Sequence, residues 1–202
     1  MNEPISLSLG DWAIGYNYAY ILSRVLDNFK PKNILELGLG QSSKIINAYV
    51  SYQRKKGKNI NYEIVEQDEN WIDFYERENS IEDITIYQRD IECINSEYGE
   101  LNRYVDFSSV VKGKKYNFIS IDGPWGGEKI SRMDVYNELP QILDNEFVVL
   151  VDDYVREGEK VMVSLFEQRL RDNNISFGSR VYQGKKDIYI IVSSNLKFLL
   201  SM

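Results

Sequence analysis

Short apolar runs alternate with amphipathic stretches along most of this chain. The apolar runs predict strands at residues 33–37, 61–66, 84–87, 116–121 and 147–151. Apolar residues that recur every three or four positions predict helices at residues 42–52, 69–79, 131–143 and 159–173. Strands that alternate with helices in this way predict an α/β fold around a parallel sheet.

The two ends of the chain depart from this alternation. Residues 9–29 predict an amphipathic helix with Asp11 as its cap, which Pro31 stops before the first strand. Residues 175–182 and 187–192 predict a terminal β-hairpin. Residues 91–115 have no strong period, and their apolar positions favour helical turns packed on the sheet.

The length of 202 residues suits one domain, and no stretch rich in Pro, Gly and Ser divides the chain. We therefore expect a single domain over residues 1–202. Within it, residues 1–31 would form a helical cap and residues 32–202 the α/β core.

The first strand leads into a glycine-rich turn. Glu36 stands near the strand end, Gly38 and Gly40 follow, and the hydroxyls of Ser42 and Ser43 open the next helix. Such a turn places backbone N–H groups and a helix N-terminus around a small ligand. Because Ser43 stands where the dinucleotide fingerprint has its third glycine, a nicotinamide or flavin is disfavoured.

This E-x-G-x-G turn resembles the first cofactor-binding motif of class I S-adenosylmethionine-dependent methyltransferases. The resemblance covers about residues 32–192 in element order. It implies a Rossmann-like, doubly wound seven-stranded sheet of order 3-2-1-4-5-7-6, with a C-terminal antiparallel hairpin and an extra N-terminal helix. The implied cofactor is S-adenosylmethionine, held by the glycine turn.

Acidic residues after the second and third strands are candidates for further cofactor contacts. Glu66 would accept hydrogen bonds from the ribose hydroxyls, with Gln67 beside it and Asp68 as the alternative acid. A solvated or helix-capping Glu66 is the other interpretation. The family pattern places Asp90 at the adenine amino group, although it could equally be a loop residue, and Glu36 would orient the turn or meet the cofactor's ammonium group.

Three acids follow the fourth and fifth predicted strands, namely Asp122, Asp152 and Asp153. Strand ends of a parallel sheet meet at one edge, and carboxylates without His or Cys suit Mg²⁺ or Mn²⁺. The arrangement resembles the metal site of catechol-type O-methyltransferases, and it makes these three residues the catalytic candidates. A metal there would lower the pKa of an acceptor hydroxyl.

An arrangement without metal answers the same electrostatic problem, because arginines can also neutralise the acids. Asp153 would then cap the next helix, and Asp152 would pair with Arg156 or Arg132. Asp122 would face the substrate as the general base.

A second set of motifs extends the resemblance. The IDGP-x-G, S-R and DD-x-x-R-x-x-E patterns resemble a branch of small methyltransferases that includes enzymes of sugar and polysaccharide O-methylation. Many relatives carry a histidine shortly after the strand-four Asp-Gly, whereas this chain has Pro124 and Trp125. The role of that histidine is therefore not carried over.

Composition limits the kinds of partner and chemistry to be expected. The formal net charge of −7 argues against a nucleic acid as partner. Because the chain has no histidine, its catalysis cannot use a His base or a His metal ligand. With one cysteine, no signal-peptide pattern and no apolar run long enough for a membrane span, we expect a cytoplasmic protein. The aromatic positions Trp12, Tyr16 and Tyr20 predict a packed or interfacial face, which could join a homo-oligomer, or a wall over the substrate.

The sequence thus favours an S-adenosylmethionine-dependent O-methyltransferase that acts on a hydroxyl of a small molecule or a sugar or glycan precursor. One alternative is a non-catalytic binding or assembly domain, whose crevice Trp12 or Trp125 would fill. A less favoured alternative is an NAD-dependent oxidoreductase.

Overall fold

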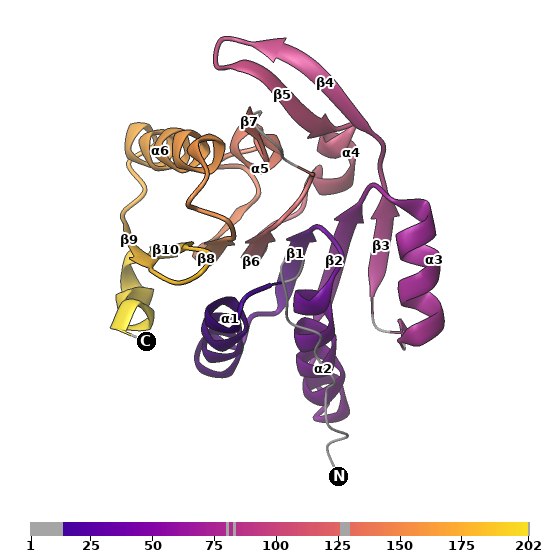
Figure 1. The fold of residues 1–202 in the computed structure, drawn as a ribbon. Helices are drawn as coiled ribbons and strands as arrows, with labels where there is room; N and C mark the ends of the chain where they lie inside the picture. The colour runs from indigo at the N-terminus through magenta and orange to yellow at the C-terminus, as the bar shows by residue number, and fades with distance from the viewer. Residues whose placement is uncertain (1–13, 80, 83, 126–129, 202) are drawn as a thin grey trace.

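A seven-stranded sheet runs through the middle of the molecule (Figure 1). The computed structural model describes residues 14–79, 81–82, 84–125 and 130–201. In spatial order the strands are β3 (Thr85–Gln88), β2 (Asn61–Glu66), β1 (Asn33–Leu37), β6 (Tyr116–Ile121), β8 (Leu143–Val151), β10 (Ile188–Ser193) and β9 (Phe177–Tyr182). Counted within this sheet alone, the order is the predicted 3-2-1-4-5-7-6, so the predicted fold is confirmed.

The strand directions also follow the prediction. Neighbouring strands from β3 to β8 are parallel, and β10 is antiparallel to both β8 and β9. The parallel strands point toward the top of Figure 1, so their carboxyl ends share one edge. Loops that lie far apart in the sequence are therefore brought together at this edge.

Helices cover both faces of the sheet. Helices α1 (Tyr16–Phe29), α2 (Gln41–Lys55) and α3 (Glu69–Glu78) contribute apolar side chains to the core on one face. Helices α4 (Phe107–Val111), α5 (Asp134–Asn137) and α6 (Glu157–Asp172) contribute to the core on the other. A terminal 3₁₀-helix, η1 (Ser194–Ser201), which the sequence did not predict, adds Leu196 and Leu199 to the first core.

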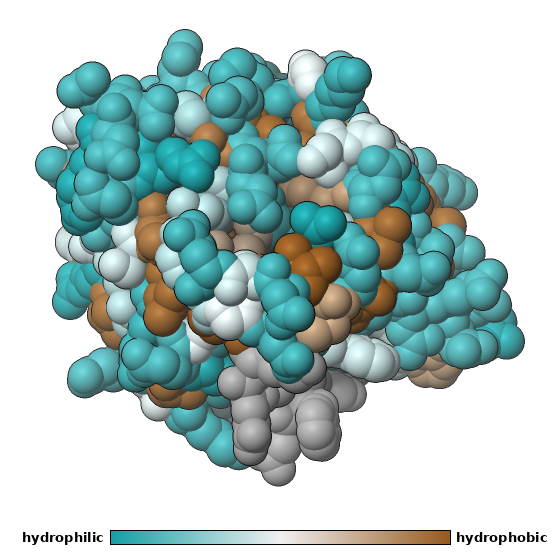
Figure 2. Space-filling model, turned by 90° about the horizontal axis from the view of Figure 1, so that it is seen from above, coloured by the Kyte–Doolittle hydropathy of each residue, from teal (hydrophilic) through white to brown (hydrophobic). Residues whose placement is uncertain are grey.

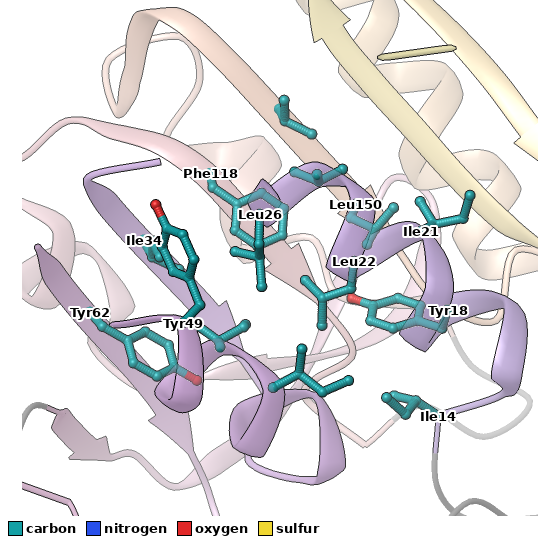
Figure 3. Packing of buried hydrophobic residues seen from close by; sticks show 14 of the residues in the cluster. Ile14, Tyr18, Ile21, Leu22, Leu26, Ile34, Tyr49, Tyr62, Phe118 and Leu150 are labelled. Atoms are coloured by element: carbon teal, nitrogen blue, oxygen red, sulfur yellow. The ribbon is translucent and has the colours of Figure 1, made fainter. Parts of the chain in front are cut away.

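Helix α1 packs across the middle of the sheet. Figure 3 shows its side chains, Leu22 and Leu26 among them, beside Phe118 and Leu150 of the strands. Its Tyr18 hydroxyl also makes a 2.7 Å hydrogen bond with Ser120 on β6. These contacts come from the 3.6-residue period that predicted the helix.

Part of the prediction for the N-terminal helix lies outside the described residues, including Asp11 and Trp12. The described helix begins at Tyr16. Tyr16 and Tyr20 are 81% and 56% exposed, so they do not form a packed face of the core. The packed interpretation is therefore wrong for these two tyrosines, whereas an interfacial face and a wall over the substrate stay predictions.

The helical turns predicted for residues 91–104 are wrong. This segment forms the hairpin of β4 (Ile91–Ser96) and β5 (Gly99–Tyr104), and β5 pairs with β7 (Ile130–Ser131) in a separate three-stranded sheet. The hairpin is only partly buried, so its strands lack the apolar alternation that reveals a strand in sequence. The turns predicted after it are present as α4.

The helix predicted for residues 131–143 is also largely wrong. Only α5 forms, and β8 begins early, at Leu143. Pro140 has no N–H to donate and disfavours helical backbone in the residue before it, so the helix cannot continue. Near its start, β8 carries the polar residues Asp144, Asn145 and Glu146, so the apolar pattern predicted only the later part of this strand.

Candidate active site

The carboxyl ends of the parallel strands form one polar edge. Backbone hydrogen bonds continue past the strands, from Gly38 N to Val65 O at 2.9 Å and from Asp122 N to Leu37 O at 2.9 Å. Asp152 N likewise donates to Ile121 O at 3.1 Å. Figure 2, seen from above this edge, shows mainly hydrophilic atoms with a few apolar side chains between them.

The glycine turn, residues 38–40, requires its first glycine for space. Gly38 has a φ of +93°, and a Cβ there would lie 3.1 Å from Gly123 N. Gly40 differs, because a Cβ there would meet no atom within 4 Å. The backbone of the turn therefore rests against the loop after β6 at Gly38 and faces open space at Gly40.

Side chains hold the peptide groups of the turn. Glu66 Oε2 accepts from Leu39 N at 2.7 Å, and Trp71 Nε1 donates to Leu39 O at 2.8 Å. Ser43 Oγ accepts from Gly40 N at 2.9 Å. Both sides of Leu39 are thus fixed. The sequence analysis assigned no role to Trp71, and only the contact between α3 and the turn reveals one.

Glu66, the predicted ribose ligand, is buried at the end of β2. Besides Leu39 N, its carboxylate accepts from Gln67 N and Asp68 N. Asp68 is the cap of α3, accepting from Asn70 N. A carboxylate has about four acceptor positions, so the three backbone donors leave Glu66 capacity for one more. Burial raises the pKa of Glu66, while the three backbone N–H groups favour its charged form.

Glu36 is fully buried at the end of β1. Its Oε2 accepts a hydrogen bond from the Tyr62 hydroxyl, and its Oε1 has no partner among the described residues. Burial raises the pKa of Glu36 to about 7, although the hydroxyls of Ser42, Tyr62 and Ser43 oppose that rise. The arrangement supports a role in orienting the turn.

Gln67 and Asp90 lie side by side at the ends of β2 and β3. The Gln88 amide donates to Gln67 O at 3.3 Å and to Asp90 Oδ1 at 2.9 Å. Asp90 is exposed, and Gln67 Oε1 is buried without a partner among the described residues. Open space at Gly40 and unused acceptors at Gln67 and Asp90 fit a ligand that offers N–H and O–H donors, as an adenosine group does.

The three predicted catalytic acids, here termed the acid cluster, come together as expected. Asp122, Asp152 and Asp153 each present an oxygen within 4.8 Å of the others. Asp152 is fully buried, and neither of its carboxylate oxygens has a hydrogen-bond partner among the described residues. Burial, followed by the charges of Asp122 and Asp153, raises its pKa to about 7.

Asp122 is the accessible member of the acid cluster, with a side chain that is 29% exposed. Burial raises the pKa of Asp122, and the positive charge of the Arg132 guanidinium opposes that rise. Asp122 is therefore the acid that can meet a molecule entering from the edge.

Arg132 occupies the centre of the acid cluster and is only 3% exposed. Its Nη2 lies 3.0 Å from Asp122 Oδ1 and 3.3 Å from Asp153 Oδ2, and its Nη1 donates to Asp152 O at 3.1 Å. One guanidinium thus contacts all three residues of the cluster. The predicted pairing of the Asp152 carboxylate with Arg156 or Arg132 is wrong, because Arg132 contacts the Asp152 backbone and Arg156 pairs with Asp153.

Further charges surround this centre. Arg156 Nη2 lies 2.9 Å and Lys186 Nζ 3.6 Å from the Asp153 carboxylate, and Glu159 Oε1 lies 3.4 Å from Arg132 Nη1. Asp153 therefore pairs with cations and does not cap α6, whose N-cap is Arg156 without a capping side chain. Glu159 is the last residue of the DD-x-x-R-x-x-E pattern noted in the sequence, which gave it no role of its own. Lys186 was not predicted as a member of this cluster.

The acid cluster offers the hard oxygen donors that Mg²⁺ and Mn²⁺ prefer. Two of its three carboxylates are already bound to the Arg132 guanidinium, however, and Asp153 carries two more cationic partners. A divalent ion would be placed against that guanidinium. The residue types fit a metal, but the charges around them do not.

The described fold is shared with solved O-methyltransferases. A proposed caffeoyl-CoA O-methyltransferase from Staphylococcus aureus aligns with a TM-score of 0.61 and 13% identity over 90% of this chain and 85% of that chain. An O-methyltransferase from Bacillus cereus, in complex with S-adenosylhomocysteine, aligns with a TM-score of 0.56 and 15% identity over 92% and 84%. A proposed O-methyltransferase from Klebsiella pneumoniae gives 0.55 and 12% over 92% and 83%.

The chain has the class I methyltransferase fold. No protein-family model matches the sequence, and no curated protein is similar to it. At these identities the likeness concerns the fold, and the chemistry has to be argued from the site.

The methyltransferase fold bears on the alternatives. Strand β10, which lies antiparallel between β8 and β9, disfavours the oxidoreductase, for which a parallel strand would be expected beside β8. The non-catalytic alternative expects a tryptophan to fill the crevice, but Trp125 is 65% exposed. Trp12, the other candidate, lies outside the described residues. None of the described helices is long and apolar enough to cross a membrane.

Proposed function

We propose that this chain transfers a methyl group from S-adenosylmethionine to a hydroxyl group of a small-molecule acceptor. The observation that carries the proposal is the presence, on one sheet edge, of a glycine turn that faces open space at Gly40 and a partly exposed carboxylate at Asp122. The first would hold the cofactor and the second would deprotonate the acceptor.

The cofactor would lie along the ends of β1, β2 and β3. Backbone groups of residues 38–40 would hold its amino-acid part, with Glu36, Ser42 and Ser43 fixing the turn. The remaining acceptor position of Glu66 would take a ribose hydroxyl, and Gln67 and Asp90 would meet the adenine. S-adenosylmethionine, when bound, supplies a methyl group on a positively charged sulfur.

Asp122 would act as the general base. Arg132 holds its Oδ1, which leaves Oδ2 to accept the proton of the acceptor hydroxyl. The electron pair left on the hydroxyl oxygen would form the new bond to the methyl carbon as the carbon–sulfur bond breaks, and the electrons of that bond would neutralise the sulfur of the departing S-adenosylhomocysteine. Because the pKa of Asp122 is raised, it is a better base than an ordinary aspartate, and it is close enough to solvent to release the proton afterwards.

A sugar or glycan precursor is expected as the acceptor from the resemblance of the 121–126 and 152–159 segments to sugar methyltransferases, and the net charge of −7 disfavours a nucleic acid. A divalent metal aid, a homo-oligomer and a cytoplasmic location stay predictions from the sequence.

Calorimetry with S-adenosylhomocysteine tests the cofactor half. The wild-type chain should bind it, and Gly40→Val should weaken binding by at least about tenfold because its side chain would enter the open space. Asp90→Ala should weaken binding by a smaller factor. Asp73 is also an exposed acid, but it lies on α3, so Asp73→Ala is the matched control and should bind as the wild type does.

Each variant is accepted only if its thermal unfolding midpoint stays near that of the wild type. A wild-type chain that binds no S-adenosylhomocysteine would contradict the proposed cofactor. Undiminished binding by Gly40→Val would contradict the proposed place of the cofactor in the fold.

A further inference from the structure

We propose that the Arg132 guanidinium takes the place of a divalent cation in the acid cluster, so that the site works without a metal ion. The statement about catalysis rests on the proposed methyltransferase function. The statement about the cation does not, because it concerns only Arg132 and its neighbours.

The contacts of Arg132 are those of a central cation. It bridges the carboxylates of Asp122 and Asp153 and donates to the backbone carbonyl of Asp152. A metal in this cluster would hold the same three residues together. Planar, delocalised and always charged, a guanidinium is suited to bridging carboxylates away from water.

The chain fixes this side chain firmly. Arg132 is buried, and Glu159, itself 2% exposed, lies against its Nη1, whereas Asp122 lies against its Nη2. The backbone of Arg132 has a φ of +64°, a left-handed conformation that arginine rarely adopts. Such a conformation persists only where surrounding contacts hold it, so the guanidinium is committed to this position.

The balance of charge leaves little need for another cation. Four carboxylates lie in or against the cluster, Asp122, Asp152, Asp153 and Glu159, and three cationic side chains face them, Arg132, Arg156 and Lys186. Among the described residues of the cluster, one negative charge is uncompensated. Asp152, whose carboxylate oxygens have no hydrogen-bond partner among those residues, is the group that bears it or takes up a proton instead.

The consequence for chemistry is a fixed division of labour within the cluster. Arg132 and Arg156 hold Asp153, and Arg132 turns one oxygen of Asp122 inward. The other oxygen of Asp122 remains for the acceptor. A guanidinium orients and stabilises the base, whereas a metal would have bound the acceptor oxygen directly.

Titration with Mn²⁺, followed by the paramagnetic resonance signal of the free ion, tests the proposal in the full chain without S-adenosylmethionine. The wild type should leave Mn²⁺ essentially free. Arg132→Gln should bind Mn²⁺ at least about tenfold more tightly, because three carboxylates then face one another without their central cation. Arg156→Gln, which removes a cation that is 40% exposed at the rim, is the control and should change binding much less.

A wild-type chain that binds one Mn²⁺ tightly, and loses it in Asp152→Asn, would overturn the proposal. Should Arg132→Gln not fold, the unfolding midpoint of the wild type still decides. No shift between chelator and excess Mn²⁺ supports the guanidinium, and a clear rise with Mn²⁺ contradicts it. Because no cofactor is present, failure here is distinct from failure to bind S-adenosylhomocysteine.

Discussion

At the scale of single residues, Gly38 and Gly40 are subject to different constraints. An alanine at Gly38 would adopt a φ of +93° and place its Cβ 3.1 Å from Gly123 N and 3.2 Å from the Asp122 carbonyl carbon. We expect Gly38→Ala to lower the free energy of unfolding by about 1–3 kcal/mol. Gly40→Ala, which meets no neighbour, should cost less than about 1 kcal/mol.

Urea denaturation of the two variants measures this difference. Equal losses of stability would mean that the close approach of the turn to the β6 loop is not what requires a glycine at position 38.

Asp134 gives a residue-scale prediction about pH. Its Oδ1 accepts from Tyr104 N at 2.9 Å, its Oδ2 is buried without a partner among the described residues, and burial raises its pKa to about 7. A raised pKa means that the folded chain keeps a proton that the unfolded chain has lost. This contribution to stability is present below about pH 4 and disappears as the pH rises through 7.

Asp134→Asn removes that titration. Between pH 5 and pH 8 the wild type should lose stability relative to the variant by on the order of 2 kcal/mol, measured by urea denaturation at both values. Glu36 and Asp152, whose pKa values are also raised to about 7, titrate in both proteins and cancel in the difference. A constant difference between the two proteins would refute the assignment.

Residue types that carry chemistry were readable from the sequence, but their partners were not. The acids of the cluster were found because carboxylates at strand ends are unusual enough to notice. Lys186 and Trp71 were missed because a lysine in a hairpin turn and a tryptophan on a helix have common structural explanations. Only the packing of distant segments brings Lys186 to Asp153 and Trp71 to Leu39.

At the scale of elements, the β4–β5 hairpin belongs to a sheet of its own. Gly99, the first residue of β5 after the hairpin turn, has a φ of +97°, and a Cβ there would meet no atom within 4 Å. Gly99→Ala should strain the turn and raise hydrogen exchange across residues 91–104 by about tenfold. The main sheet should be unaffected, because β4 and β5 form no ladder with it.

Gly113→Ala is the matched control, since Gly113 also has a positive φ, +73°, and no neighbour within 4 Å of a Cβ. It lies in the loop before β6, so its effect should be local to that loop. Faster exchange throughout the seven-stranded sheet of Gly99→Ala would show that the two sheets unfold together.

Elements were predictable where one physical signal dominated. The buried strands β1, β2 and β6 were predicted at their observed residues because most of their inner positions are apolar. The hairpin failed because its half-exposed strands mix polar and apolar residues. The helix predicted for residues 131–143 was wrong because Pro140 interrupts it, although the apolar residues around it recur at helical spacing.

At the scale of the whole molecule, the order of strands determines where the chemistry lies. Because β1 sits between β2 and β6, the glycine turn lies between the predicted ribose acid and the acid cluster. The predicted strand order therefore already implied the position of the site. The hydrogen-bond and charge network within it follows from side-chain geometry that no sequence pattern encodes.

The contact between Lys186 and Asp153 also has a temporal meaning. The chain is synthesised from its N-terminus, so Glu36 is the first charged residue of the site to be made. Lys186, the last one, lies in the turn between the two final strands. Strand β10, which follows that turn, inserts between β8 and β9. A nascent fragment that ends before β10 cannot complete the seven-stranded sheet, so in a stalled or truncated chain Asp153 would lack the contact that the turn before β10 brings to it.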